Sequence, residues 1–180
     1  MKKIFLILNF VLALNVYCAE IIGEAVKIID GDTFILKEET YTIIPTGNEN
    51  VKIVQRGTFK IRLADIDAPE ITQKFGEQAK THLQMLIDGK RIKVIFHKID
   101  MYGRIVGTIY LTDKIIGIDI SDNESINERM VRDGYAWWFK GYSKKYSFGK
   151  LEYEAQGFKR GIWSEENNIP PWIFRKQNEK

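Results

Sequence analysis

The stretch FKIRLADIDAPE at residues 59–70 decides the fold of this 180-residue chain. Within it Phe59, Ile61 and Leu63 alternate with polar residues, which is the two-residue period of a β-strand with one buried face. The pattern predicts a strand over residues 59–66. Pro69 ends that strand, because proline has no N–H to donate to a neighbouring strand. The charged side chains of the stretch therefore lie where the chain leaves the sheet.

Four further strands are predicted around this one. Residues 25–36 predict a hairpin, because apolar runs border the turn-forming pair Asp30-Gly31. Residues 91–96 and 105–111 are apolar and complete a set of five strands. Residues 38–57 combine glycine, asparagine and one proline with short apolar runs, and they predict either a long loop or an added hairpin.

Three helices are predicted at residues 76–88, 126–133 and 149–160, each ending before a glycine. The order of three strands, a helix, two strands and two helices indicates an α+β fold. Five strands with a helix between the third and fourth also describe the oligonucleotide/oligosaccharide-binding (OB) barrel. We expect a single domain over residues 20–180, with a C-terminal extension after about residue 165 in which residues 169–172 form an ordered wrap.

The first nineteen residues differ from the rest of the chain. A basic start at Lys2 and Lys3 precedes an apolar run that ends at Ala19, shorter than the roughly 20 residues of a membrane-spanning helix. This predicts a secretory signal peptide over residues 1–19, and hence export to a periplasm or the outside of the cell. An uncleaved N-terminal anchor is the alternative. Cleavage would also remove Cys18, the sole cysteine.

Composition excludes several classes of protein. Hydrophobic residues make up 44% and aromatic residues 12% of the chain, which is enough for a core and argues against disorder. A single cysteine excludes an internal disulfide framework and a cysteine-based zinc site. The net charge of +3 is too small to establish nucleic-acid binding. Local charge is more informative, because residues 129–160 hold eight basic and three acidic residues, with aromatic residues among them.

Three clusters of charged residues suggest chemistry on an anionic substrate. Asp30 and Asp32 occupy a turn, residues 62–70 hold an arginine and three acids, and residues 100–104 end in an arginine. Asp65 and Asp67 are two apart and are expected on one strand face. Carboxylates without histidine or cysteine favour Ca²⁺ or Mg²⁺ over zinc, and arginine binds phosphate bidentately. Each cluster alone also fits a charged turn or edge strand.

Five segments of the chain resemble the staphylococcal (micrococcal) nuclease family, also called thermonucleases. They occur in the family's order and cover residues 25–164. The segments are Asp30-Gly31-Asp32-Thr33, residues 62–70, Tyr102-Gly103-Arg104, residues 127–134 and Gly161-Ile162-Trp163-Ser164.

The resemblance implies a five-stranded OB-fold barrel with three helices, and calcium-dependent hydrolysis of DNA and RNA that leaves 3′-phosphate and 5′-hydroxyl ends. Three groups would hold Ca²⁺. The resemblance leaves open whether Mg²⁺ or Mn²⁺ also supports the activity. The implied metal ligands are Asp32, Asp67 and the backbone carbonyl of Ala68, with Asp30 behind them. The implied catalytic residues are Glu70, which acts on the attacking water, and Arg62 and Arg104, which grip the phosphate.

The resemblance also implies a nucleotide pocket and shows three departures. Tyr142 and Tyr102 are expected to contact nucleic acid, and Lys140 stands where the family has a second pocket tyrosine. Asp65 adds a carboxylate that either changes metal preference or pairs with a lysine. Residues 38–57 are longer than the family's usual link.

We expect a monomer that prefers single-stranded or unpaired DNA and RNA. The alternatives are a non-catalytic OB-fold module that binds single strands or a protein, and a structural calcium-binding surface protein.

Overall fold

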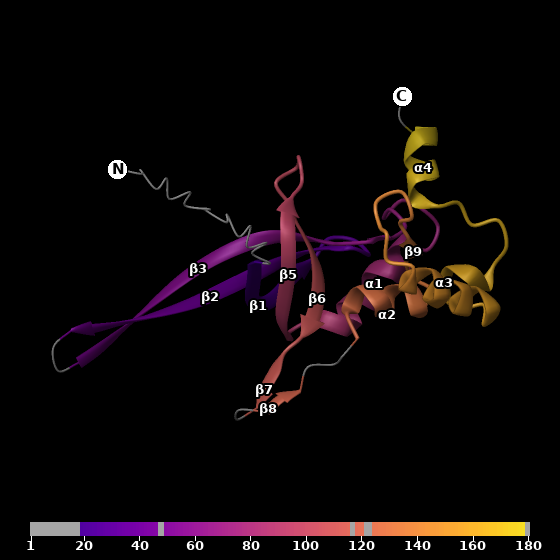
Figure 1. Cartoon of the computed structure of the whole chain (residues 1–180). Helices are drawn as coiled ribbons and strands as arrows, with labels where there is room; N and C mark the ends of the chain where they lie inside the picture. Colours follow the sequence, from indigo (N-terminus) through magenta and orange to yellow (C-terminus); the bar gives the residue numbers. More distant parts are fainter. Residues whose placement is uncertain (1–18, 47–48, 116–117, 121–123, 179–180) are drawn as a thin grey trace, which may run out of the picture.

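The computed structural model describes residues 19–46, 49–115, 118–120 and 124–178. Five strands close into a barrel in the order β1-β2-β3-β6-β5 (Figure 1). Neighbouring strands are antiparallel except β3 and β6, which are parallel. This confirms the expected α+β barrel. The strands are β1 (Ala19–Ile28), β2 (Thr33–Thr46), β3 (Glu49–Leu63), β5 (Arg91–Ile99) and β6 (Ile105–Leu111).

The barrel closes because alternate residues of its strands are large and apolar and point inward. Helix α1 (Gly76–Ile87) adds the buried side chains of Ala79, Leu83 and Ile87 to the same core. Burying each large aliphatic side chain contributes about 1.5–3 kcal/mol, so the interior is the main source of stability. The strand residues that are almost completely buried include Phe34, Leu36, Ile61, Leu63, Ile92, Val94 and Ile109.

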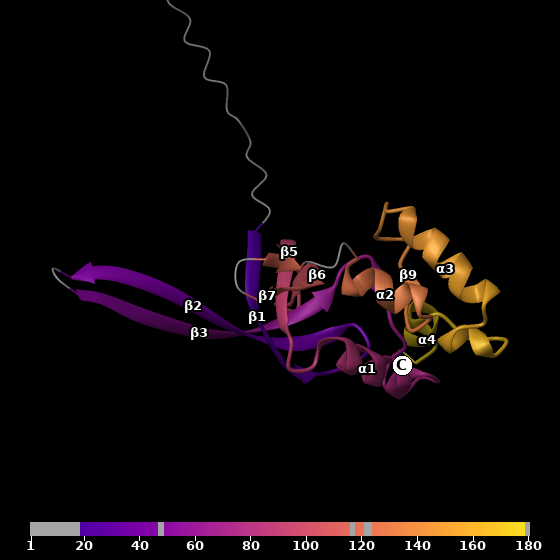
Figure 2. The ribbon, with the colours of Figure 1, turned by 90° about the horizontal axis from the view of Figure 1, so that it is seen from below.

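Residues 38–57 form an added hairpin, so the alternative of a long loop is wrong. The β2–β3 pairing is continuous from Thr33 opposite Arg62 to Thr46 opposite Glu49. In both views this hairpin projects beyond the barrel, away from the helices (Figures 1 and 2). The strand predicted over residues 59–66 is therefore the last part of a longer strand, and it ends at Leu63 rather than at residue 66.

Helices gather at one end of the barrel. All three predicted helices are present, as α1, α2 (Ile126–Arg132) and α3 (Ser147–Gly157), and a 3₁₀ turn spans Gly161–Ser164. Ser125 and Glu128 form a capping box that begins α2. The tail contains a fourth helix, α4 (Pro171–Asn178), where an ordered wrap was expected. Proline at its first position has no N–H to leave unpaired, which suits a helix start.

Two short strand pairings complete the fold. Strand β4 (Ile66–Asp67) pairs with β9 (Trp137–Trp138), which ties the end of the core segment to the helical layer. Strands β7 (Asp113–Ile115) and β8 (Ile118–Ile120) form a small hairpin.

No helix within the described residues is long and apolar enough to cross a bilayer. Residues 1–18 of the predicted signal peptide lie outside the described part of the chain.

The side chain of Asn127 joins α2 to the barrel. Its Oδ1 accepts a hydrogen bond from the Ile109 N–H at 3.0 Å, and its Nδ2 donates to the carbonyls of Ala64 at 2.9 Å and Gly107 at 3.2 Å. Asn127 is completely buried. These bonds hold the β3–β4 turn and strand β6 together.

Replacing Asn127 with alanine should therefore lower the free energy of unfolding by about 3 kcal/mol, because buried backbone groups lose their partner. Urea unfolding of the chelator-treated protein measures this. Asn178→Ala is the matched control, because Asn178 is exposed and its Nδ2 donates only within α4, to Phe174. A loss below about 0.5 kcal/mol for Asn127→Ala would contradict this role.

Candidate active site

The turn between β1 and β2 brings two carboxylates to the end of the barrel. The N–H of Asp32 donates to Oδ1 of Asp30 at 3.0 Å, which closes a tight local turn. Gly31 lies so near α1 that a Cβ there would come within 2.7 Å of the side chains of Ala68 and Ala79. Only glycine fits this approach, and the approach places Asp32 beside the segment that follows β3. The N–H of Ala68 donates to Asp32 Oδ2 at 3.0 Å.

A sharp turn after β3 redirects the chain. Asp65 has a φ of 67°, in the left-handed region that aspartate tolerates better than most residues. The turn breaks the strand alternation, so Asp67 lies on β4 and faces back toward β3. The expectation that Asp65 and Asp67 share one strand face is therefore wrong.

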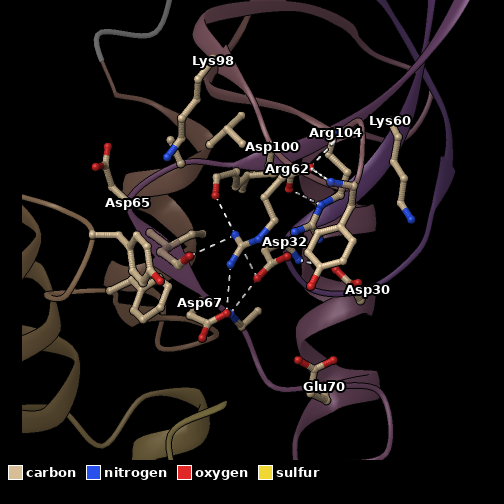
Figure 3. A pocket seen from close by; sticks show the side chains of 18 of the residues that line it. Asp30, Asp32, Lys60, Arg62, Asp65, Asp67, Glu70, Lys98, Asp100 and Arg104 are labelled. Carbon is tan, nitrogen blue, oxygen red and sulfur yellow. Dashed lines mark hydrogen bonds and ion pairs between the residues drawn. The ribbon is translucent and has the colours of Figure 1, made fainter. Parts of the chain in front are cut away.

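Arg62 is the centre of the site (Figure 3). Its Nη1 donates to the carbonyls of Leu63 at 2.7 Å and Ile66 at 3.0 Å. The same guanidinium forms ion pairs with Asp32 Oδ2 at 3.1 Å and Asp67 Oδ1 at 2.9 Å. Two backbone carbonyls thus fix its plane, and two carboxylates from different elements converge on it.

Asp65 points away from this centre in Figure 3 and pairs with Lys145 at 2.8 Å. Of the two roles that the sequence left open for Asp65, the described contacts favour pairing with a lysine.

Glu70 follows Pro69 and is held by local backbone bonds. Its N–H donates to Oε1 of Gln73 at 3.2 Å, and its carbonyl accepts from the Gln73 N–H at 2.8 Å. Its carboxylate forms an ion pair at 2.6 Å with Arg175 of α4, a residue that the sequence analysis did not single out. Glu70 is partly exposed, so its carboxylate is within reach of solvent and substrate.

Arg104 reaches the pocket from the turn between β5 and β6. Asp100 Oδ1 accepts from the N–H groups of Tyr102 at 2.9 Å and Arg104 at 3.0 Å, and Asp100 Oδ2 pairs with Arg104 Nε at 2.7 Å. Burial acts to raise the pKa of Asp100, but the hydrogen bonds from Arg104 and Tyr102 outweigh it and lower that pKa. The Arg104 guanidinium also lies 5.4 Å from the centre of the Tyr102 ring.

These groups line one cavity of about 850 Å³. Tyr102 and Tyr142 stand at its wall with exposed rings, and the ring of Phe139 lies 4.6 Å from that of Tyr142. Lys140 is not among the lining residues, and its Nζ lies 3.4 Å from Glu152 Oε2. The predicted site residues that the cavity brings together are Asp30, Asp32, Arg62, Asp67, Ala68, Glu70, Tyr102, Arg104 and Tyr142.

The carboxylates at the base of the cavity carry perturbed acidities. Burial and the neighbouring charge of Asp32 raise the pKa of Asp30 to about 6. Burial also raises the pKa of Asp67, although hydrogen bonding from Arg175 opposes the shift. Grouped carboxylates of this kind are strained in their charged form and gain from a nearby cation.

The donor set at this point fits a hard divalent cation. Asp32 and Asp67 are buried and lie around the same guanidinium, and both offer only oxygen ligands. Across the described ranges, no three His, Cys, Asp or Glu side chains form a closed metal cage. Two carboxylates would leave coordination positions for water, a backbone carbonyl and a phosphate, as a catalytic Ca²⁺ or Mg²⁺ requires.

The raised pKa of Asp30 predicts that this carboxylate destabilises the chelator-treated protein at neutral pH. Its folded-state pKa of about 6 exceeds the ordinary 3.8, so the folded protein holds a proton that the unfolded chain has lost. The stability that the folded protein gains from binding this proton is complete below about pH 4 and is lost as the pH rises through 6.

Asp30→Asn should therefore raise stability at pH 7.5 by about 1 kcal/mol, a value reduced for the partial exposure of the group, and change little at pH 4. Thermal unfolding in chelator at both pH values measures this. Asp88→Asn, at an exposed position after α1, is the control. An equal effect of Asp30→Asn at both pH values would contradict the interpretation.

A small α+β barrel that gathers three arginines and six acids around one cavity at its end defines a class of protein that acts on phosphodiesters. The family model for staphylococcal nuclease homologues matches residues 60–165. An uncharacterised endonuclease of Escherichia coli is 33% identical over 175 residues, which are 97% of this chain and 98% of that protein. A micrococcal nuclease of Shigella flexneri is 34% identical over 160 residues, covering 88% of this chain and 82% of the relative.

A probable staphylococcal-like nuclease of Oryza sativa subsp. japonica is 36% identical over 141 residues, 78% of this chain and 35% of the plant protein. The chain belongs to the staphylococcal nuclease family. It is a nuclease, a phosphodiester hydrolase whose substrates are nucleic acids.

Three basic residues and one phenylalanine that line the cavity were not predicted as site residues. Lys60 lies two residues before Arg62 on β3, so strand alternation alone could have found it. Lys98 lies in residues 90–104, which hold five basic residues and one acidic residue. Phe139 and Arg175 carry no local signal, because their place in the cavity depends on β9 and α4 packing beside residues 62–70.

Proposed function

We propose that the protein is a calcium-dependent endonuclease that cleaves DNA and RNA and leaves 3′-phosphate and 5′-hydroxyl ends. One observation carries the proposal. One open cavity contains a guanidinium fixed by two carbonyls, a pair of buried carboxylates, a second arginine and a solvent-accessible glutamate. This set supplies a place for a cation, two groups for a phosphate and one group for water.

Each residue has a distinct task in this proposal. Asp32, Asp67 and the carbonyl of Ala68 would hold the ion, which when bound supplies positive charge next to the scissile phosphate. Arg62 and Arg104 bind the non-bridging oxygens, where negative charge grows in the transition state. Glu70 takes a proton from the water that attacks phosphorus. The bond to the 5′ oxygen then breaks, and that oxygen gains a proton from solvent.

The cavity wall supports a preference for unpaired nucleotides. The rings of Tyr102 and Tyr142 are 75% and 76% exposed, although tyrosine is usually at least half-buried. Exposed aromatic faces beside an anion site can stack on bases, and every base of a single strand offers such a face. Lys140 is engaged with Glu152, so in this arrangement it contributes positive charge outside the cavity rather than a contact within it.

The test is cleavage of labelled single-stranded DNA and RNA by the purified protein in calcium, in magnesium, in manganese and in a calcium chelator. We expect activity in calcium, its loss in the chelator and its return when calcium is restored. A kinase should label the new 5′ ends without prior dephosphorylation, whereas polymerase extension of the new 3′ ends should require phosphatase first. Products with the opposite ends, or full activity in chelator, would overturn the proposal.

We further propose that residues 1–19 direct export and that the mature protein acts as a monomer. The basic start and short apolar run of the sequence support export. N-terminal sequencing of the protein from the extracytoplasmic fraction tests the first point, and light scattering at several concentrations tests the second. An unprocessed N-terminus, or a mass that corresponds to a dimer, would contradict them.

A further inference from the structure

Helix α4 is attached to the rim of the active-site cavity at two points. The ring of Trp172, in its first turn, stacks on Phe139 with centroids 5.4 Å apart and planes 16° from parallel. Just before the helix, the side-chain amide of Gln73 donates to the carbonyl of Ile169. In both views α4 lies at the helical end of the barrel, near β9 (Figures 1 and 2). The C-terminal segment thus reaches the site through defined contacts.

These contacts place the guanidinium of Arg175 on the catalytic acids. Nη2 of Arg175 is 2.7 Å from Asp67 Oδ2, and Nη1 is 2.6 Å from Glu70 Oε1. Nη1 also donates to Asp67 Oδ1 at 3.3 Å. A single planar group therefore bridges the buried Asp67 and the more exposed Glu70, which come from β4 and from the loop before α1.

The two carboxylates are consequently occupied by cationic side chains. Asp67 receives Arg62 on one oxygen and Arg175 on both, and Glu70 receives Arg175. A divalent ion needs lone pairs of the same Asp67 oxygens. The two guanidiniums already use most of the acceptor positions of Asp67, so an ion that binds the same oxygens must displace at least one of them, and its charge also repels both.

Of the two arginines, Arg175 is the one that can leave. Arg62 belongs to a barrel strand and is tied to the carbonyls of Leu63 and Ile66. Arg175 lies on an eight-residue helix at the end of the chain, and its side chain is 38% exposed against 13% for Arg62. Terminal helices attached through few contacts open at little cost.

We propose that Arg175 is a built-in cation that holds Asp67 and Glu70 in the metal-free protein, and that calcium binding displaces Arg175 and loosens α4 from the cavity. The inference rests on the proposed calcium site. It makes the C-terminal helix a metal-competitive cover of the catalytic acids. The apparent calcium affinity is then lower than the intrinsic one by the factor that favours the arginine-bound form.

Isothermal titration of calcium into the chelator-stripped, full-chain protein tests the competition without measuring activity. Arg175→Gln should tighten calcium binding about tenfold, because the ion no longer displaces a guanidinium. Lys176→Gln is the matched control, since it removes an exposed positive charge from the same helix and should leave the dissociation constant within about twofold. Equal or weaker binding by Arg175→Gln would overturn the competition alone. Absence of saturable binding in every protein would overturn the calcium site as well.

A second variant and a second readout protect the test from effects on folding. Trp172→Ala removes the stacking contact of α4 but keeps Arg175, and it should also tighten calcium binding. In the unmodified protein, calcium should increase hydrogen exchange of the backbone amides of α4, as measured by mass spectrometry. Slower exchange of α4 in calcium, or weaker calcium binding by Trp172→Ala, would show that the helix supports the ion instead of competing with it.

Discussion

Glu70→Gln should reduce kcat in calcium by about a thousandfold, with little change in KM. Glutamine keeps the shape and the hydrogen-bonding oxygen of the side chain but cannot accept the proton of the attacking water. Removing a positioned general base typically costs between 10² and 10⁴ in rate. Glu70 is partly exposed, and its backbone bonds to Gln73 do not involve its carboxylate. The ion pair with Arg175 is weakened, but Asp67 still holds Arg175, so the fold should be unaffected.

The measurement is single-turnover cleavage of a labelled single strand, together with thermal unfolding. Glu77→Gln on α1 is the matched control, because Glu77 is exposed in the first turn of that helix and does not line the cavity. Binding of an uncleavable oligonucleotide should be equal in Glu70→Gln and the unmodified protein. A rate within tenfold of the unmodified protein would remove Glu70 from the role of base.

Arg104→Lys should lower kcat by about a hundredfold. Lysine can still pair with Asp100, but it lacks the planar fork that binds two phosphate oxygens at once. The Asp100 carboxylate aims the guanidinium of Arg104 into the cavity through its Nε, which leaves the two terminal nitrogens for the substrate. The loss of one such donor to developing negative charge typically costs 10² to 10³ in rate.

The same single-turnover assay gives the result, with KM expected to change less than kcat because the lost interaction strengthens in the transition state. Arg91→Lys at the start of β5 is the control, since Arg91 is exposed and is not among the cavity residues. An equal loss in both variants would indicate a general effect of arginine on nucleic-acid binding. A change in KM alone for Arg104→Lys would indicate ground-state binding only.

The barrel could be predicted because its strands and helices carry local patterns. Phe59, Ile61 and Leu63 alternate, Asp30-Gly31 marks a turn, and α1 has an apolar face that ends before Gly89. These signals act over a few residues, so they survive in a bare sequence. The ends of elements were less accurate: residues 64–66 are a turn and the start of β4, because Asp65 adopts a left-handed backbone that strand periodicity does not reveal.

For the candidate site too, local features could be predicted from the sequence and long-range contacts could not. The sequence determined which chemical groups are present, because the acids and arginines of residues 30–32, 62–70 and 100–104 are close to one another along the chain. Only the tertiary structure decided how they meet. Strand alternation separates Arg62 from Asp67, and the turn at Asp65 brings them to 2.9 Å.

Side-chain direction was decided by packing as well. Lys140 and Asp65 each lie near the site in sequence, yet they pair with Glu152 and Lys145. Arg175 lies 108 residues from Asp67 along the chain and still contacts it at 2.7 Å. Local pattern cannot predict such a contact, because it depends on Trp172 packing against Phe139 and on the folded barrel end that receives α4. Short-range periodicity therefore determined the elements and their chemistry, and long-range packing determined which charges face one another.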